Sequence, residues 1–252
     1  MQDNPVALVT GANQGIGFEI ARGLVSAGLT VLVGSRSIER GEQAAATLGE
    51  RAVALQLDVT DQASITTAAD RIRNEFGRLD ILVQNAAIAA AAGRAFDSGE
   101  ELAAANRPSV VSLGDMREVW NTNVFGVLAV YQAMVPLLKE TPNSRIVNVS
   151  SGMGSLTLAS DANLPVRQLF DASYSASKTA LNALTVAMAI ELETFGIKVN
   201  AISPGHTKTR LTGFSGGDTP EQGAAEAIRV ALLGSDGPTG TFTHATMGNL
   251  PW

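Results

Sequence analysis

The 252-residue sequence predicts an α/β protein whose single domain is a doubly wound parallel sheet with helices on both faces. Two observations predict this fold. Short continuous apolar segments, as expected of parallel strands buried on both faces, alternate regularly with stretches of helical periodicity. The first apolar segment, Val6–Val9, runs directly into a glycine-rich turn and then into such a helical stretch. Because no repeat or linker interrupts the alternation, we expect one domain over residues 1–252.

The glycine-rich turn predicts a binding site for a pyrophosphate. Residues 10–17 include Gly11, Gly15 and Gly17, and apolar residues recur at helical spacing from 16 to 27. Glycines allow the backbone to approach a pyrophosphate closely, and the amino terminus of a helix offers free N–H groups and a favourable dipole. This strand, turn and helix are therefore typical of the start of a Rossmann-type dinucleotide-binding fold.

The end of the second predicted strand indicates which dinucleotide binds. This strand covers residues 30–34 and is followed by Ser35 and Arg36, where NAD-binding folds usually have an acidic residue. A carboxylate would repel a 2′-phosphate, whereas a hydroxyl and a guanidinium would bind it. We therefore expect NADPH as the cofactor, and we leave open whether Arg40 also contacts the phosphate.

The rest of the chain continues the alternation of strands and helices. Further strands are predicted at residues 52–57, 81–83, 145–149, 198–202 and 241–243, and further helices at 38–48, 65–76, 99–105, 115–139, 174–195 and 220–233. Parallel strands place their carboxyl ends at one edge of the sheet, so Gly11, Arg36, Asp58 and Asn85 are expected to converge there.

Two connections are longer than this fold requires. They cover about residues 89–111 and 152–171, and both leave from the carboxyl ends of predicted strands. Long connections in a compact α/β domain are often lids or binding loops, so we expect both segments to cover the substrate.

Two helical stretches carry polar residues that packing alone does not explain. Asn121, Asn123 and Gly126 lie inside a predicted helix although asparagine and glycine are unfavourable there, which predicts a strained or functional site. Tyr174 and Lys178 are four residues apart, so both side chains lie on one side of the predicted helix. An ammonium close to a phenol lowers the pKa of the phenol, and we expect this pair to act as a general acid and base.

The overall composition excludes several other functions. The net charge is −6 and no basic run is present, so we expect no binding to nucleic acid or to an anionic membrane. The chain has no cysteine, and its two histidines, His206 and His244, lie far apart, so we expect no metal site. We recognise no leader sequence and no apolar run of about 20 residues, and we expect a cytoplasmic protein.

A series of short motifs resembles the short-chain dehydrogenase/reductase family over essentially the whole chain, and within it the NADPH-dependent carbonyl reductases. In chain order the motifs are Thr10-Gly-x-x-x-Gly-Ile-Gly17, Asp58-Val59, Asn85-Ala86, Asn123-x-x-Gly126, Ser150-Ser151, Tyr174-x-x-x-Lys178 and Pro204-Gly205. The chain departs from the usual family pattern at Ala87, where glycine is more common.

The resemblance implies a role for each of these residues. Tyr174 would donate a proton to the substrate carbonyl oxygen, Ser151 would hydrogen-bond the same oxygen, and Asn123 would hold a water molecule of the proton relay. Lys178 would bind the nicotinamide ribose and lower the pKa of Tyr174. The residues expected to contact the cofactor are Gly11, Asn13, Gln14, Gly15, Ile16, Gly17, Ser35, Arg36, Asp58, Val59, Asn85, Ala86, Ala87, Tyr174, Lys178, Pro204, Gly205, Thr207 and Thr209.

The expected function is that of an NADPH-dependent carbonyl reductase, which transfers hydride from the nicotinamide to a small ketone or aldehyde. Two alternatives remain at this point: an NAD-dependent alcohol dehydrogenase of the same family, and a regulator that binds NADP without turnover. Either a monomer or a homo-oligomer is compatible with the sequence.

Overall fold

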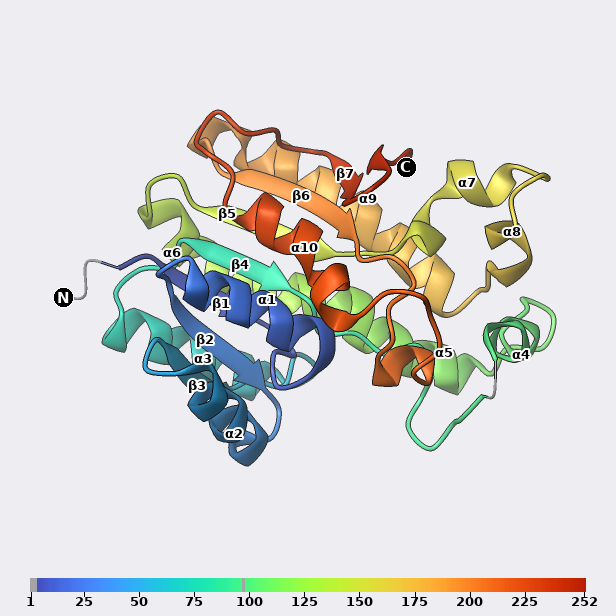
Figure 1. Cartoon of the computed structure of the whole chain (residues 1–252), viewed down its shortest axis with the longest axis horizontal. Helices are drawn as coiled ribbons and strands as arrows, with labels where there is room; N and C mark the ends of the chain where they lie inside the picture. Colours follow the sequence, from blue (N-terminus) through green and yellow to red (C-terminus); the bar gives the residue numbers. More distant parts are fainter. Residues whose placement is uncertain (1–3, 97) are drawn as a thin grey trace.

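Short apolar segments form a single sheet in the computed structural model, which describes residues 4–96 and 98–252 (Figure 1). Within the described residues the strands are β1 (Val6–Val9), β2 (Thr30–Ser35), β3 (Ala52–Gln56), β4 (Ile81–Gln84), β5 (Arg145–Val149), β6 (Lys198–Ser203), β7 (Phe242–His244) and β8 (Gly248–Asn249). Their order is β3-β2-β1-β4-β5-β6-β7-β8. All neighbouring pairs are parallel except β7 and β8, which are antiparallel. The predicted fold is thus confirmed, and β8 is an addition that the sequence did not predict.

Helices cover both faces of this sheet. They are α1 (Gly15–Ser26), α2 (Ile38–Leu48), α3 (Gln62–Glu75), α4 (Gly99–Ala105), α5 (Leu113–Trp120), α6 (Val127–Glu140), α7 (Leu156–Ser160), α8 (Val166–Leu169), α9 (Tyr174–Leu192) and α10 (Pro220–Ala231). Shorter helical segments are the π-helix η1 (Asn121–Gly126) and the 3₁₀ turns η2 (Gly152–Gly154), η3 (Glu193–Phe195) and η4 (Arg210–Thr212). One face carries α1, α2 and α10, and the opposite face carries α3, α6 and α9.

The alternation of side chains along each strand divides the core into two layers. In β1, Val6 and Leu8 pack with α3 and α6, whereas Ala7 and Val9 pack with α1 and α10. A fully buried aliphatic side chain contributes about 1.5–3 kcal/mol, and both layers consist mainly of such residues. Continuous apolar strands are therefore required here, because neither face of the sheet is left to solvent.

The long helix predicted at 115–139 is continuous but not uniformly α-helical. It consists of α5, η1 and α6, and the π-helical segment coincides with the asparagine and glycine residues that are unfavourable in a helix. Gly126 is required by packing, because a Cβ at this position would lie 2.7 Å from the carbonyl oxygen of Val59. Gly126 therefore allows the π-helix to lie close against the loop that follows β3.

By length and composition alone, the helical stretch Leu113–Glu140 resembles a membrane span, although the sequence had suggested that no such segment exists. Half of its most apolar window is buried inside the fold. It also contains Asn123, whose polar side chain is fully buried. Within the fold this stretch is a core helix that packs against the sheet.

Candidate active site

The glycine turn after β1 has the backbone geometry of an anion-binding loop. Gly11 and Gly15 have φ angles of 64° and 58°, which residues with a side chain rarely adopt. A Cβ at Gly17 would lie 2.4 Å from Nδ2 of Asn85, so only glycine allows α1 to begin this close to the end of β4. The N-cap residue Gln14 makes no side-chain capping bond, and the first N–H groups of α1 are left for an external acceptor.

Thr10 and Asn85 hold this turn in place. The Thr10 hydroxyl accepts hydrogen bonds from the backbone N–H groups of Asn85 (2.9 Å) and Ala86 (3.0 Å). The Asn85 amide donates to the carbonyl oxygens of Thr10 (2.9 Å) and Gly11 (3.2 Å). Asn85 and Ala86 are therefore next to the glycine turn, as the predicted contact with the cofactor requires, and Ala87 follows them in a partly buried position. The role of Thr10 was not predicted, because it depends on contacts with β4.

The carboxyl end of β2 only partly matches the prediction for a 2′-phosphate site. Ser35 is buried, and its hydroxyl donates a 2.8 Å hydrogen bond to the carbonyl oxygen of Ser37, so that its proton is already used. In this structure the proton is thus directed at the protein backbone, and the contact of Ser35 with the phosphate stays a prediction. Arg36 is exposed and forms no ion pair among the described residues, and Arg40 lies in the first turn of α2. The positive charge at this position consequently comes from Arg36 and Arg40.

Asp58 and Val59 follow β3 at the same edge of the sheet. Oδ1 of Asp58 accepts hydrogen bonds from the backbone N–H (2.9 Å) and the hydroxyl (2.7 Å) of Thr60. This fixes the carboxylate in a partly buried position. Val59 is partly buried below Gly126 of the π-helix.

The helix that carries Tyr174 begins at a well-defined cap. Oδ1 of Asp171 accepts 2.7 Å hydrogen bonds from the N–H groups of Ser173 and Tyr174, and Oδ2 accepts from the N–H and the hydroxyl of Ser175. The sequence suggested Asp171 or Ser173 as the cap, and the structure selects Asp171. The Ser173 side chain makes no capping bond.

Ser151, Tyr174 and Lys178 come together beyond the end of β5. The Lys178 side chain is buried, its Nζ donates a 2.8 Å hydrogen bond to the carbonyl oxygen of Val149, and it lies 5.8 Å from the centroid of the Tyr174 ring. The Ser151 side chain interacts with the phenol of Tyr174 and also accepts a hydrogen bond from the N–H of Met153. The predicted spacing on one face of the helix is thus confirmed.

The pKa values of Tyr174 and Lys178 shift in opposite directions. Burial raises the pKa of Tyr174 to about 12; the Ser151 side chain lowers this pKa, and the negative charge of Asp171 raises it. Burial lowers the pKa of Lys178 to about 8. The ammonium of Lys178 is bound to a backbone carbonyl and is itself desolvated, and the expectation that Lys178 lowers the pKa of Tyr174 stays a prediction.

Asn123 forms a link between three segments of the site. Its Oδ1 accepts a 2.9 Å hydrogen bond from the N–H of Ile88, and its Nδ2 donates to the carbonyl oxygen of Ile88 (2.9 Å) and to the hydroxyl of Ser177 (3.0 Å). Ser177 in turn donates to the carbonyl oxygen of Tyr174. Both amide protons of Asn123 are therefore used to hold the segment after β4 against α9. Any direct role in a proton relay stays a prediction.

The loop after β6 approaches the glycine turn. Thr207 is buried and its hydroxyl donates to the carbonyl oxygen of Pro204 (3.1 Å), which fixes the first turn of this loop. Gly205 has a φ of 78°, and a Cβ there would lie 2.6 Å from Oδ2 of Asp218. Farther along, Cγ2 of Thr209 would be 3.6 Å from a Cβ placed on Gly15. The loop and the glycine turn thus border the same space.

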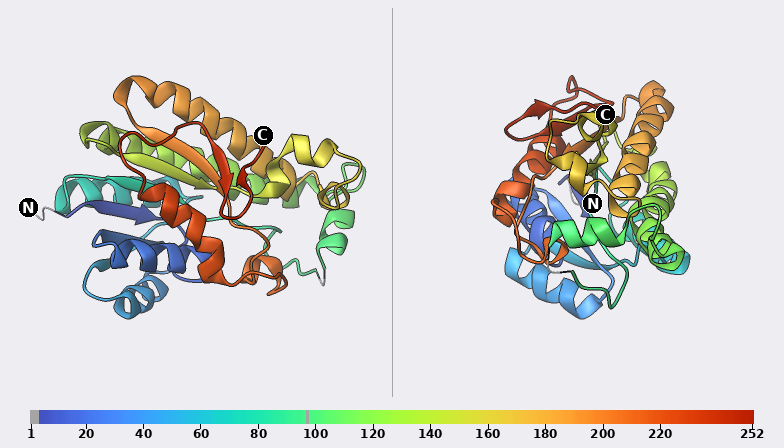
Figure 2. Two further views of the ribbon diagram at one scale, coloured as in Figure 1. Left: turned by 45° about the horizontal axis from the view of Figure 1, so that its top comes forward. Right: turned by 90° about the vertical axis from the view of Figure 1, so that its right-hand side faces the viewer.

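The two long connections lie side by side at this end of the molecule (Figures 1 and 2). Leu169 of α8 lies next to Gly99 of α4, and the N–H of Ala172 donates a 3.0 Å hydrogen bond to the carbonyl oxygen of Asn106. The predicted short helix at 99–105 is confirmed as α4. Because both segments stand beside the start of α9, they are adjacent to Tyr174.

The carboxyl-terminal residues fasten the second of these segments to the sheet. Ser155 donates a 2.7 Å hydrogen bond to the carbonyl oxygen of Pro251, and the N–H and hydroxyl of Thr157 donate to that of Trp252. The Trp252 ring stacks on Phe242 of β7, with 5.4 Å between the ring centroids. Residues 155–157 are therefore held by the carboxyl-terminal residues, whereas the rest of α7 and α8 extends away from the sheet (Figure 2).

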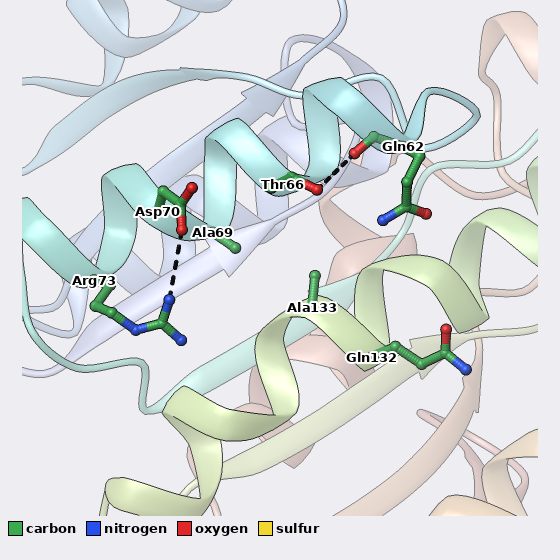
Figure 3. A pocket seen from close by; sticks show the side chains of 7 residues that line it. All are labelled: Gln62, Thr66, Ala69, Asp70, Arg73, Gln132 and Ala133. Atoms are coloured by element: carbon green, nitrogen blue, oxygen red, sulfur yellow. Dashed lines mark hydrogen bonds and ion pairs between the residues drawn. The ribbon is translucent and has the colours of Figure 1, made fainter.

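The surface of the molecule also has a shallow groove. It lies between α3 and α6, and its lining residues are Gln62, Thr66, Ala69, Asp70, Arg73, Gln132 and Ala133 (Figure 3). None of these residues belongs to the predicted site. The candidate active site is therefore the region at the carboxyl ends of β1 to β6.

Comparisons with known proteins identify the family of the chain. A family model described as "short chain dehydrogenase" matches residues 5–218. Salutaridine reductase of Papaver somniferum is 33% identical over 290 residues, covering 94% of this chain and 93% of that protein. (+)-Neomenthol dehydrogenase of Arabidopsis thaliana is 36% identical over 285 residues, covering 94% of each.

Solved structures give the same result. The structure of salutaridine reductase from Papaver somniferum superposes with a TM-score of 0.79 at 33% identity, covering 95% of this chain and 99% of that one. A 3-ketoacyl-(acyl-carrier-protein) reductase from Brucella melitensis, complexed with NADH, has a TM-score of 0.77 at 25% identity, with 96% of each chain covered.

Proposed function

The chain belongs to the short-chain dehydrogenase family, and on that premise we propose that it is an NADPH-dependent carbonyl reductase in which Tyr174 donates the proton. The observation that carries the proposal is the position of Ser151, Tyr174 and Lys178 beside one another at the carboxyl end of β5. Ligands in doubly wound sheets bind at this edge. The relatives include proteins named as reductases, which supports the reductive direction.

Two hydroxyl groups of the site can act on a substrate carbonyl. When the carbonyl carbon accepts hydride, negative charge develops on the oxygen, and hydrogen-bond donors placed there stabilise it. Ser151 donates a hydrogen bond to this oxygen and Tyr174 transfers its proton to it. Burial raises the pKa of Tyr174 to about 12, which keeps the phenol protonated and able to donate near neutral pH.

The residues of the site fit a nicotinamide dinucleotide, which when bound supplies the hydride. The uncapped start of α1 and the positive φ of Gly11 and Gly15 suit a pyrophosphate. In this proposal Lys178 binds the ribose hydroxyls. Arg36 supports NADPH over NADH, because its guanidinium is exposed, unpaired among the described residues and not accompanied by an acidic residue at position 35.

An NAD-dependent alcohol dehydrogenase is the second candidate. It is favoured by the buried hydroxyl of Ser35, which is not free to donate to a 2′-phosphate, and by the structural relative that is complexed with NADH. The ratio of kcat/KM with NADPH to that with NADH separates the two enzymes. A preference for NADH would support the second candidate, and cofactor binding without turnover on any substrate would indicate a regulator.

The proposal is tested by Tyr174→Phe, which keeps the ring and removes the phenolic proton. We expect kcat to fall by about 10²–10⁴-fold on a panel of ketones and aldehydes, with little change in NADPH affinity. The matched control is Tyr131→Phe. Tyr131 is the other tyrosine of the chain, and its hydroxyl bonds Glu191. Near-normal turnover of the Tyr174 variant would disprove the assignment.

A further inference from the structure

Asp171 is a buried carboxylate without a cationic partner. Its side chain is only 3% exposed, and it forms no ion pair among residues 4–96 and 98–252. Its charge is stabilised instead by three backbone N–H groups and the Ser175 hydroxyl at the start of α9. A buried charge with only neutral partners costs free energy that a simple cap does not require.

Another aspartate of the chain shows what an ordinary cap looks like. Asp61 caps α3 by accepting one hydrogen bond, of 3.0 Å, from the N–H of Ala63, and it is exposed to solvent. Asp171 differs because one of its bonds, of 2.7 Å, goes to the backbone of Tyr174 itself. Its position is fixed in turn by the neighbouring Ala172, which is bound to Asn106 at the end of α4.

We propose that Asp171 is the positioning residue of this site: its carboxylate fixes the backbone of Tyr174 and places a buried negative charge at the start of the helix that carries the proton donor. This inference rests on the proposed function, since it assigns to Asp171 an action through Tyr174. No sequence motif of the family resemblance includes Asp171; the inference comes from its hydrogen bonds and its burial.

The electrostatic surroundings give this charge its effect. The groups that act on the Tyr174 phenol are Asp171, three residues earlier, and the neutral Ser151 hydroxyl from the end of β5. Lys178, from the next turn of α9, donates to the carbonyl oxygen of Val149 and lies 5.8 Å from the ring. The negative charge of Asp171 disfavours the phenolate, so it raises the pKa of Tyr174 and retains the proton until it is transferred.

The experiment follows the phenol directly. The chain has only two tyrosines, so replacement of both by 3-fluorotyrosine gives two ¹⁹F signals, which Tyr131→Phe and Tyr174→Phe assign. The more acidic fluorophenol allows titration at a lower pH than tyrosine. Asp171→Asn removes the charge and keeps one oxygen that can accept the capping hydrogen bonds. Asp171→Ser is a second variant with a neutral capping side chain. Asp61→Asn is the control, because it removes the charge of an exposed cap on another helix.

We expect the titration midpoint of Tyr174 to fall in Asp171→Asn and Asp171→Ser, while that of Tyr131 stays unchanged and Asp61→Asn behaves as the wild type. In the reduction assay, the alkaline loss of kcat should move to lower pH in the same two variants. If Asp171 were only a structural cap, the titration midpoint of Tyr174 would be the same in the wild type and in a folded neutral variant. An unchanged Tyr174 midpoint in either folded variant would overturn the inference.

The NMR titration does not depend on catalysis. If no carbonyl substrate is turned over but the midpoint shifts, then the proposed function has failed and the electrostatic link from Asp171 to Tyr174 stands. If turnover is normal and the midpoint does not move, the inference alone has failed.

Discussion

The ammonium of Lys178 donates a 2.8 Å hydrogen bond to the carbonyl oxygen of Val149, the last residue of β5. One backbone carbonyl replaces the water that would otherwise surround this charge, because the lysine is buried. Burial accordingly lowers its pKa from 10.5 to about 8. The geometry that holds Lys178 beside Tyr174 therefore reduces the stability of the folded protein.

This relationship predicts a pH-dependent stability difference between the wild type and Lys178→Met. Below pH 8 the ammonium is charged in both the folded and the unfolded state, and the folded state bears the full desolvation penalty. Between pH 8 and 10.5 the unfolded state binds more protons, so wild-type stability rises with pH through this group. The free energy of unfolding of Lys178→Met relative to wild type should thus decline over this range.

Urea unfolding at a series of pH values measures this difference. Lys198→Met is a suitable control. Lys198 is the first residue of β6, at the end of the strand away from the candidate site, and it is less buried than Lys178. It should show no such decline. If the difference in free energy of unfolding between wild type and Lys178→Met stays constant from pH 7.5 to about 10.5, then burial does not lower the pKa of Lys178. Turnover of Lys178→Met should also be strongly reduced, because the proposed contact with the cofactor ribose is lost.

Arg36 is expected to determine the preference for NADPH. In Arg36→Ala the KM for NADPH should rise about tenfold, because a charge-assisted bond is worth about 1.5–3 kcal/mol and solvent reduces this value at an exposed position. The KM for NADH should hardly change. Arg73→Ala is the control, since Arg73 is on α3 and pairs with Asp70. Equal effects on both cofactors would contradict this role.

The buried position of Ser35 changes how a shift toward NADH should be engineered. Ser35→Asp would place a carboxylate in a site that is 2% exposed and close to Gly41, so it should destabilise the protein as well as repel NADPH. Comparing the melting temperature of Ser35→Asp with that of Arg36→Ala separates the loss of stability from the repulsion of NADPH. Wild-type stability of Ser35→Asp would show that this position opens to solvent.

The segment formed by α7 and α8 is expected to act as a substrate lid. Replacing residues 158–164 with a short turn leaves the anchors Ser155 and Thr157 bound to the carboxyl-terminal residues. The KM for bulky ketones should rise several-fold more than that for small ketones, because bulky substrates need the additional contact area. NADPH affinity should not change.

Trp252→Ala tests the same lid by a smaller change. It removes the stacking on Phe242 and should loosen residues 155–157, so that the KM values shift in the same direction by a smaller amount. Equal losses for all ketones, or a loss of NADPH binding, would show that the segment supports the fold instead of covering the substrate.

The architecture, and the local backbone geometry of the candidate site, could be predicted from the sequence. Short continuous apolar segments that alternate with helices are typical of strands buried on both faces, as in a parallel sheet between two layers of helices. The glycines of the first turn and the spacing of Tyr174 and Lys178 depend on local backbone geometry, which a few neighbouring residues specify. These predictions therefore agreed with the observed elements, and the unfavourable Asn121–Gly126 segment was correctly identified as irregular.

The hydrogen-bond partners of the side chains could not be predicted in the same way, because they depend on how distant segments pack. The hydroxyl of Ser35 points into a turn, Lys178 binds the carbonyl of Val149 in the adjacent strand, and Asn123 joins Ile88 to Ser177. Each of these outcomes depends on a partner or on burial that arises when distant segments pack together. A hydrogen-bonding group takes whichever partner the fold brings within about 3 Å, and desolvation depends on everything packed around it. Neither quantity is encoded in a local pattern.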